Sequence, residues 1–268
     1  MRVAFDYLRG PALGHKTRCE ILQRELVARG HTIVGLAEAK DWRVYDYPTP
    51  PMAALEPCKR LLMGQLPITA QDYAWHPLGA VAERTMHGPR YIIVDPYNIM
   101  TCFAVPKISN ILITCGGSDP FGLTERLLSA LGHYADNFHQ DPRWGISANI
   151  GVVIGPNFGR EVSVPFGITI YRAPNNTSMC YIMAQYNTVV AAWGGTVFEA
   201  LALGCHVLPI TTQPEHPAEA EILGIPYITR QHDFTDETLL FRKTGGNFGI
   251  DYQGVTRVVE QMEAWHGS

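Results

Sequence analysis

The chain has 268 residues, of which 46% are hydrophobic and 17% are charged, and its formal net charge is −4. This apolar content supports packed cores and excludes a mainly disordered chain. The small negative charge gives no general attraction to nucleic acid or to anionic membranes. No apolar run approaches the ~20 residues that span a bilayer, and the opening residues MRVAFDYLRG predict a strand and not a signal peptide. We therefore expect a cytoplasmic protein.

Six cysteines are spread through the chain, and no two of them form a CxxC pair. They do not gather with histidines at the spacing of a zinc finger either. We expect reduced, mostly buried thiols and no structural zinc site.

The first third of the chain begins with a βαβ pattern and then loses its periodicity. The predicted elements are, in order, a strand at 3–5, a helix at 17–29, a strand at 32–36, a short helix near 58–63, a helix at 78–86 and a strand at 91–94. Gly30 is expected to end the first long helix. Residues 40–77 are rich in proline and are otherwise predicted as loop.

A second and more regular series follows residue 108. The predicted strands are 111–114, 151–154, 168–171, 188–191, 206–210 and 227–229, and the predicted helices are 121–134, 178–185, 196–203, 217–223 and 253–265. Strands that alternate with helices indicate parallel sheets covered on both faces. The sequence therefore predicts an α/β fold of two Rossmann-like, doubly wound domains, divided as 1–105 and 106–268, with a ligand site in the cleft between them.

Two loops at strand ends could bind an anion. Gly14-His15-Lys16-Thr17-Arg18 stands at the start of the first helix, where backbone N–H groups and the helix dipole favour negative charge. His15 could act there as a general base, or it could only cap the helix. Gly116, Gly117 and Ser118 form the second loop, which could hold a diphosphate or be a simple tight turn.

Two further loops follow late strands. In Trp193-Gly194-Gly195-Thr196-Val197-Phe198-Glu199, Thr196 and Glu199 have the spacing of a capping box. The alternative is that the Gly194–Gly195 backbone faces phosphate while Glu199 accepts hydrogen bonds from ribose hydroxyls. The segment from Thr211 to Pro217, which contains Gln213, is either a solvated loop or part of the same site.

Together these loops resemble the GT-B glycosyltransferase superfamily. The order GHxxR, GGSDP and GGTxxEAxxLG is similar to the branch that contains the peptidoglycan glycosyltransferase MurG and the UDP-sugar hydrolase PseG. The segments ILITCGGSDPFGLTERLLSAL and VVAAWGGTVFEALALG resemble PseG most closely. Only 18 residues, Asn98 to Cys115, separate Tyr97 from Gly116, fewer than in PseG-like chains, so the first domain is expected to be shortened.

The resemblance implies roles for individual residues. His15 matches the group that activates the attacking hydroxyl or water, and Gly14 lies beside it. The resemblance assigns the donor site to Gly14, Gly116, Gly117, Ser118, Tyr171, Gly194, Gly195, Thr196, Glu199 and Gln213, with backbone near Tyr171 to Ala173 meeting the base. It also implies that the last helix crosses back to the first domain. No metal or other cofactor is expected, since the chain has no DxD-like signature and backbone dipoles can stabilise a leaving diphosphate.

These implications predict a metal-independent transferase that moves a sugar from a nucleotide diphosphate donor, by resemblance a UDP-sugar, to an acceptor hydroxyl with His15 as base. A PseG-like hydrolase with water as acceptor is the alternative. A non-catalytic nucleotide-sugar binder is a third hypothesis. The acceptor stays open among a small molecule, a glycan, a lipid and a modified DNA base.

Overall fold

The chain folds into two compact units. The computed structural model describes residues 1–7, 13–38, 40–47, 58–64, 72–78, 82–107, 109–135, 149–232, 234 and 248–268. Unit 1 consists of Met1–Pro96 together with Gly249–Ser268, and unit 2 is Tyr97–Phe248. The boundary thus lies at Pro96–Tyr97, where the sequence-based division had 105–106, and the final segment is part of the first unit.

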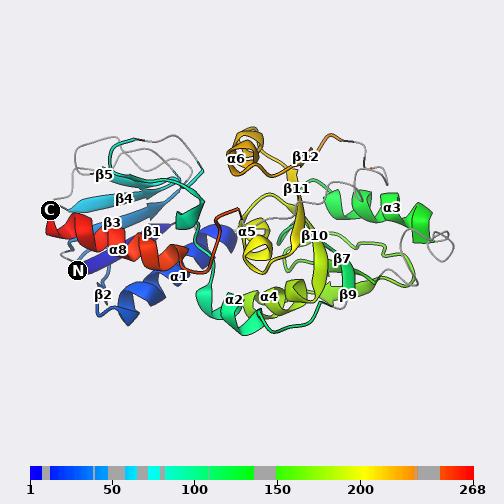
Figure 1. Cartoon of the computed structure of the whole chain (residues 1–268), viewed down its shortest axis with the longest axis horizontal. Helices are drawn as coiled ribbons and strands as arrows, with labels where there is room; N and C mark the ends of the chain where they lie inside the picture. Colours follow the sequence, from blue (N-terminus) through cyan, green and yellow to red (C-terminus); the bar gives the residue numbers. More distant parts are fainter. Residues whose placement is uncertain are drawn as a thin grey trace. The chain divides into compact units, whose positions relative to one another are not determined.

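Unit 1 is built on a six-stranded parallel sheet in the order β2-β1-β3-β4-β5-β6. Its strands are β1 (Arg2–Tyr7), β2 (Thr32–Ile33), β3 (Trp42–Asp46), β4 (Lys59–Met63), β5 (Asp72–Trp75) and β6 (Thr85–Met86). Its helices are α1 (Leu13–Ala28), the 3₁₀ helix η1 (Pro89–Tyr91) and α8 (Gly254–Gly267). Figure 1 shows α1 and α8 side by side along this sheet.

Several predictions for unit 1 were wrong. The segment 58–63 is a strand and not a helix, and 40–77 contains three strands of the sheet. No helix occupies the described part of 78–86, and 91–94 is the end of η1 followed by extended chain outside the sheet. The strands were missed because they carry charges, which hide the apolar pattern. Arg60 of β4 donates to Asp72, its register partner on β5, at 2.6 Å, so both charges are neutralised within the sheet.

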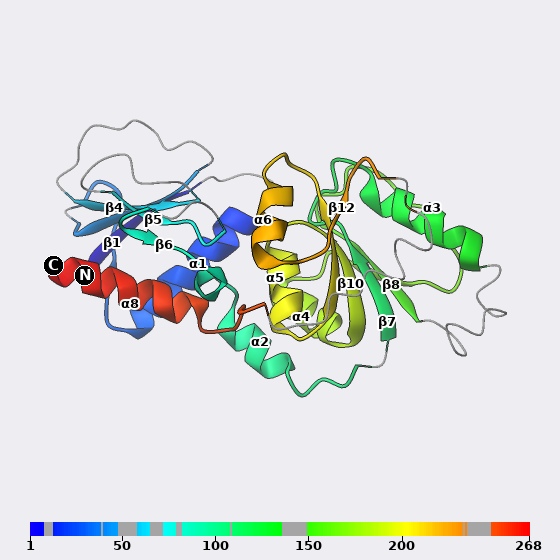
Figure 2. The same ribbon diagram turned by 45° about the horizontal axis from the view of Figure 1, so that its top comes forward.

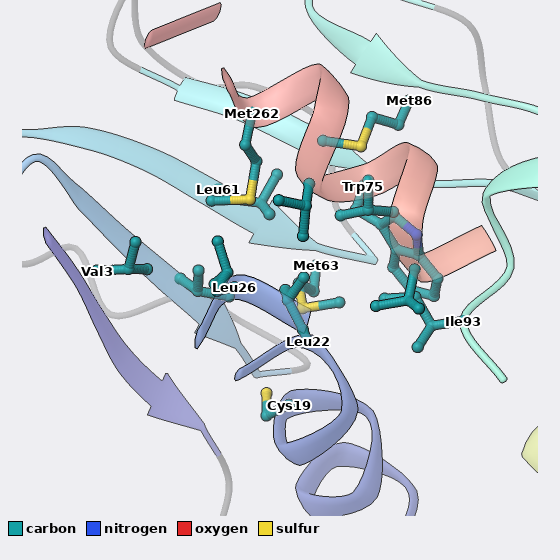
Figure 3. Packing of buried hydrophobic residues seen from close by; sticks show 14 of the residues in the cluster. Val3, Cys19, Leu22, Leu26, Leu61, Met63, Trp75, Met86, Ile93 and Met262 are labelled. Carbon is teal, nitrogen blue, oxygen red and sulfur yellow. The ribbon is translucent and has the colours of Figure 1, made fainter. Parts of the chain in front are cut away.

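The core of unit 1 joins the two ends of the chain. Leu22 and Leu26 of α1 and Val258 and Met262 of α8 are fully buried against the same cluster of strand side chains. Figure 3 shows Met262 beside Leu61 and Leu22 beside Met63 within this cluster. The apolar face of α8 is therefore an integral part of this core.

Unit 2 carries a second six-stranded parallel sheet in the order β12-β11-β10-β7-β8-β9. Its strands are β7 (Ser109–Thr114), β8 (Ile150–Ile154), β9 (Thr169–Arg172), β10 (Tyr186–Ala192), β11 (His206–Thr211) and β12 (Ile228–Thr229). Its helices are α2 (Pro96–Cys102), which starts at the unit boundary, α3 (Leu123–Ala135), α4 (Asn176–Ala184), α5 (Gly195–Ala202) and α6 (His216–Leu223). Apart from α2, which was not predicted, these elements agree with the sequence prediction.

Helices cover both faces of this sheet, as buried parallel strands require. Figure 2 shows α3 on one side and α4 with α5 on the other. Leu123 and Leu127 of α3 pack with Ile111 and Ile113 of β7, while Leu112 between them points to the opposite face. Both units are thus α/β layers built on a parallel sheet with one reversal of strand order, as expected for Rossmann-like domains.

All six cysteines are buried, and none is paired in a disulfide. Among the residues that the structure describes, no helix is both long and apolar enough to cross a membrane.

Candidate active site

Each sheet has one point where the strand order reverses, and the candidate residues gather at these two points. In unit 1 the chain leaves β1 toward β2 on one side and re-enters the sheet at β3 on the other. In unit 2 the same reversal separates β7 from β10. Loops at the carboxyl ends of two such strands diverge to opposite faces, which leaves a crevice where α/β proteins bind ligands.

In unit 1 this position holds a cluster around Asp46, the last residue of β3. His15, Arg18 and Cys19 lie three and four residues apart on α1, so they share one helix face. All three contact the Asp46 carboxylate, which is fully buried. His15 Nδ1 lies 2.7 Å from Oδ1, Arg18 donates to Oδ1 at 2.6 Å and to Oδ2 at 3.0 Å, and Cys19 Sγ lies 3.6 Å from Oδ2.

This geometry assigns the proton positions of His15. A carboxylate only accepts hydrogen bonds, so the 2.7 Å contact requires a proton on Nδ1. The Arg18 nitrogen that lies 3.3 Å from Nδ1 is then a neighbouring charge and not a second donor to that atom. In the neutral imidazole, Nε2 keeps its lone pair and can accept a proton.

The Asp46 carboxylate is held in its ionised form. Burial by itself raises the pKa of Asp46, but the hydrogen bond from His15 and the charge of Arg18 outweigh it, so the pKa lies below its ordinary value. Burial, together with the charge of Asp46, raises the pKa of the Cys19 thiol. Cys19 therefore stays protonated and serves as a weak donor to Asp46.

In unit 2 the carboxyl end of β7 leads into Gly116, Gly117 and Ser118. Gly116 has a φ of 89°, which favours glycine. The Gly117 carbonyl oxygen accepts the Asn157 N–H at 2.8 Å, and a Cβ built on Gly155 would lie 2.4 Å from that oxygen. Close backbone packing therefore fixes this turn against the loop that follows β8.

Asp119, directly after this turn, has a structural role. Its buried carboxylate accepts the backbone N–H groups of Leu123 at 2.9 Å and Thr124 at 2.8 Å. It therefore caps the start of α3. Arg160 lies 3.3 Å from the same carboxylate and balances its charge.

The carboxyl end of β10 leads directly into α5. The helix begins at Gly195, and its N-cap is Gly194, with a φ of 152°. Thr196 is therefore inside the helix, and the predicted capping box is wrong, since no described side chain caps this end. The first N–H groups of α5 keep their donor capacity, which favours an anion there.

The chain was compared with family models, with curated proteins and with solved structures. No family model matches the chain. The uncharacterized protein MJ1062 of Methanocaldococcus jannaschii is 31% identical over 137 residues, which span 46% of this chain and 26% of that protein.

Solved structures match along the whole chain. MurG of Acinetobacter baumannii has a TM-score of 0.61 at 14% identity, with 98% of this chain and 99% of that chain covered. The spinosyn forosaminyltransferase SpnP has a TM-score of 0.61 at 12% identity, with 100% of both chains covered. A UDP-GlcNAc 2-epimerase from Methanocaldococcus jannaschii, in complex with UDP-GlcNAc and UDP, matches at 0.61 and 11%, over 98% of this chain and 100% of that one.

The chain has the fold of GT-B glycosyltransferases.

Within this GT-B fold, Trp193 joins two of the candidate loops. Its indole N–H donates to Glu219 of α6 at 2.6 Å, and its ring lies 6.1 Å from that of His216. Nδ1 of His216 is in turn within reach of the backbone N–H groups of Thr212 at 3.2 Å and Gln213 at 3.3 Å. This network fixes the loop between β11 and α6 to the residue before the Gly194–Gly195 turn, while Gln213 is exposed.

The remaining predicted GT-B donor residues lie in different settings. Glu199 is half-buried, one turn into α5. The Tyr171 hydroxyl lies 3.1 Å from that of Tyr186, whose ring passes over Gly151 near the start of β8, so the Tyr171 side chain is turned away from the carboxyl ends of the strands. Only the backbone at 171–173, where Ala173 has a φ of 44°, is at that edge.

Sequence reasoning missed Asp46 and the Trp193–Glu219 pair, and it named Arg18 as part of the GHxxR motif without predicting its contact with Asp46. The usable signal for Asp46 was an apolar run, Val44-Tyr45, that ends in an aspartate, as strands at catalytic edges do. In the described part of the GT-B fold, no group of three or more His, Cys, Asp or Glu side chains is placed to hold a metal ion.

Proposed function

We propose that the protein is a glycosyltransferase that moves a sugar from a nucleotide diphosphate donor, a UDP-sugar, to an acceptor hydroxyl. The observation that carries the proposal is the His15–Asp46 pair at the strand reversal of unit 1. A neutral imidazole with Nδ1 held by a buried carboxylate is the arrangement of a general base.

In the proposed reaction, Nε2 of His15 takes the proton of the acceptor hydroxyl. The electron pair left on the hydroxyl oxygen forms a bond to the anomeric carbon of the donor sugar, and the bond from that carbon to the diphosphate oxygen breaks. The nucleoside diphosphate leaves with the bonding electrons. General-base assistance of this kind contributes about 10²–10⁴-fold to the rate.

Unit 2 is proposed to hold the donor. The N-terminal end of α5, with Gly194, Gly195 and Thr196, would receive the diphosphate through backbone N–H groups. Glu199 would accept the ribose hydroxyls, Gln213 would contact the sugar, and Gly116, Gly117 and Ser118 would approach the phosphates. Stabilisation of the leaving group by these dipoles needs no metal, so we propose metal-independent transfer.

Nucleotide binding tests this assignment. UDP, GDP, CDP and dTDP are each added to the protein, and the thermal unfolding midpoint is recorded. At 100 times its dissociation constant, a bound nucleotide adds about 2.7 kcal/mol of stability. We expect a selective shift with UDP that is lost in Glu199→Ala and kept in the control Glu221→Ala, whose carboxylate is exposed on α6. Equal shifts in the two variants would contradict the ribose role.

Hydrolysis of the same donor is the second candidate function. Its motivation is that the His15–Asp46 pair can activate water in the same way as a hydroxyl, and that the GGSDP and GGT segments resemble PseG. The two reactions are separated by measuring free sugar released from UDP-GlcNAc without acceptor. If free sugar is released without acceptor as fast as UDP is released with one, hydrolysis is favoured. If free sugar is released far more slowly, transfer is favoured.

A further inference from the structure

Asp46 accepts hydrogen bonds from Arg18 in addition to the contact with His15. Arg18 donates to both oxygens of the carboxylate, at 2.6 and 3.0 Å, while His15 uses only Oδ1. The guanidinium also lies 4.9 Å from the ring centre of Trp75 of β5, a stacked position that restricts its movement. Arg18 therefore binds Asp46 through a two-pronged contact and is itself held in place.

This third group changes what protonation of His15 would do to the cluster. A guanidinium stays charged at every physiological pH, so Arg18 and Asp46 together carry no net charge. Adding a proton to His15 then leaves the cluster with a charge of plus one. Without Arg18 the same proton would produce a neutral imidazolium–carboxylate pair, which is electrostatically favoured. An imidazolium cannot act as a base.

We propose that Arg18 is a positioning residue that keeps the His15–Asp46 pair in its proton-accepting state. Its two donor nitrogens fix the orientation of the Asp46 carboxylate. Its positive charge opposes protonation of the His15 imidazole. The proposal rests on the proposed function, in which His15 is the base, and it adds the residue that keeps that base unprotonated.

Among the residues that the structure describes, the other charged groups near the cluster are already engaged. Lys16, in the same turn of α1, is exposed and lies 3.7 Å from Glu20. On the neighbouring strand β1, Asp6 accepts hydrogen bonds from Arg43 at 2.7 Å and from the Tyr47 hydroxyl at 2.5 Å. Cys19 is buried and protonated. Arg18 is thus the cation in direct contact with both members of the pair.

The first test follows His15 itself and needs no substrate. Histidine ring signals are recorded by NMR across a pH series, and the His15 signal is assigned by its loss in His15→Ala. At each pH of the series, the protonated fraction of His15 should be larger in Arg18→Gln than in the wild type, because the opposing charge is gone. Lys16→Gln removes the same charge from the same turn and should leave that fraction unchanged. An unchanged fraction in a folded Arg18→Gln protein overturns the proposal.

The second test asks whether Arg18 acts through Asp46. The kcat/KM for UDP release from UDP-GlcNAc is compared for Asp46→Asn and for the double variant Asp46→Asn/Arg18→Gln, which leaves no unpaired carboxylate. The comparison is made at a pH where the NMR spectra show a neutral His15 in both variants, so that the direct charge effect of Arg18 does not enter. If Arg18 then acts through Asp46, the two values agree within about twofold. A further large loss in the double variant at that pH overturns the proposal. Full turnover in His15→Ala would refute the proposed function alone, because the NMR result does not depend on turnover.

Discussion

The two units share one architecture but equip the strand reversal in opposite ways. Unit 1 places side chains there: an imidazole, a guanidinium and a thiol from one face of α1 meet the buried Asp46. Unit 2 places backbone there: the Gly116–Gly117 turn and the uncapped start of α5 at Gly195. A proton must be moved by a titratable group fixed in orientation, whereas a diphosphate can be held by peptide N–H groups. The same layers can therefore serve two different tasks.

The two units also treat a buried carboxyl group differently. The charges and hydrogen bonds around Asp46 lower its pKa despite burial. Burial raises the pKa of Glu219, and the single hydrogen bond from Trp193 does not compensate. The hydrogen bond from His15 and the guanidinium of Arg18 thus lower the pKa of Asp46 despite burial, whereas one indole donor leaves the pKa of the half-buried Glu219 raised.

The largest effect is expected at His15. His15→Ala should lower kcat by about 10²–10⁴-fold, because it removes the proposed base. The UDP-induced thermal shift should persist, since the proposed donor site belongs to unit 2. His266→Ala is the control, because that histidine is exposed on α8. Loss of nucleotide binding in His15→Ala would show that the division of tasks between the units is wrong.

Asp46→Asn should have the next largest effect. A hydrogen bond to a charged group contributes about 1.5–3 kcal/mol, so turnover should fall by about 10- to 150-fold. The asparagine keeps the shape of the side chain but can no longer hold Nδ1–H of His15 as an anion would. Steady-state kinetics measure the loss, and wild-type turnover in this variant would contradict the role of the pair.

Gly194→Ala tests the backbone site. The φ of 152° lies in a region open almost only to glycine, so alanine should lower the free energy of unfolding by about 1–3 kcal/mol. Gly195→Ala is the matched control, because Gly195 lies in the first turn of α5 and its added Cβ would have no atom within 4 Å. Urea unfolding measures both, and equal stability of the two variants would mean that the turn is not constrained.

The smallest effect concerns pH. Because the folded-state pKa of Asp46 is lowered, its stabilisation is complete above the unfolded value of about 3.9 and is lost as the pH falls through the folded value. The pKa of Glu219 is raised, so it destabilises the fold as the pH rises from about 4.3 through the folded value. The urea midpoint of the wild type minus that of Asp46→Asn should therefore rise with pH. The midpoint of the wild type minus that of Glu219→Gln should fall with pH. Parallel changes would contradict the comparison.

Sequence patterns predicted unit 2 well and unit 1 poorly for a physical reason. The strands of unit 2 are apolar on both faces, as in Ile150–Ile154, so their composition identifies them without knowledge of their neighbours. The strands of unit 1 contain Arg43, Arg60 and Asp72, whose partners lie on adjacent strands. Such charge pairs form only when the strands lie side by side in the folded sheet. The spacing of residues along the sequence therefore does not predict them.

The candidate site follows the same rule. His15, Gly194 and Glu199 belong to short motifs with recognisable spacing, and these could be predicted. Asp46 is 31 residues from His15, and only the parallel pairing of β1 with β3 brings it to the start of α1. The capping box failed because the N-cap lies two residues earlier, at Gly194, where the absence of a side chain permits the sharper entry into α5.

The return of α8 to unit 1 has a consequence for the order in which the chain can fold during synthesis. Val255, Val258, Val259 and Met262 complete a core whose other buried members precede Pro96, and the 97–248 segment of unit 2 is made in between. At 5–20 residues per second, that interval lasts about 8–30 s. Unit 2 can reach its final fold on the ribosome while the sheet of unit 1 still lacks part of its apolar cover. A released chain that ends before residue 254 should therefore expose unit 1 to chaperones and proteases and leave unit 2 protected.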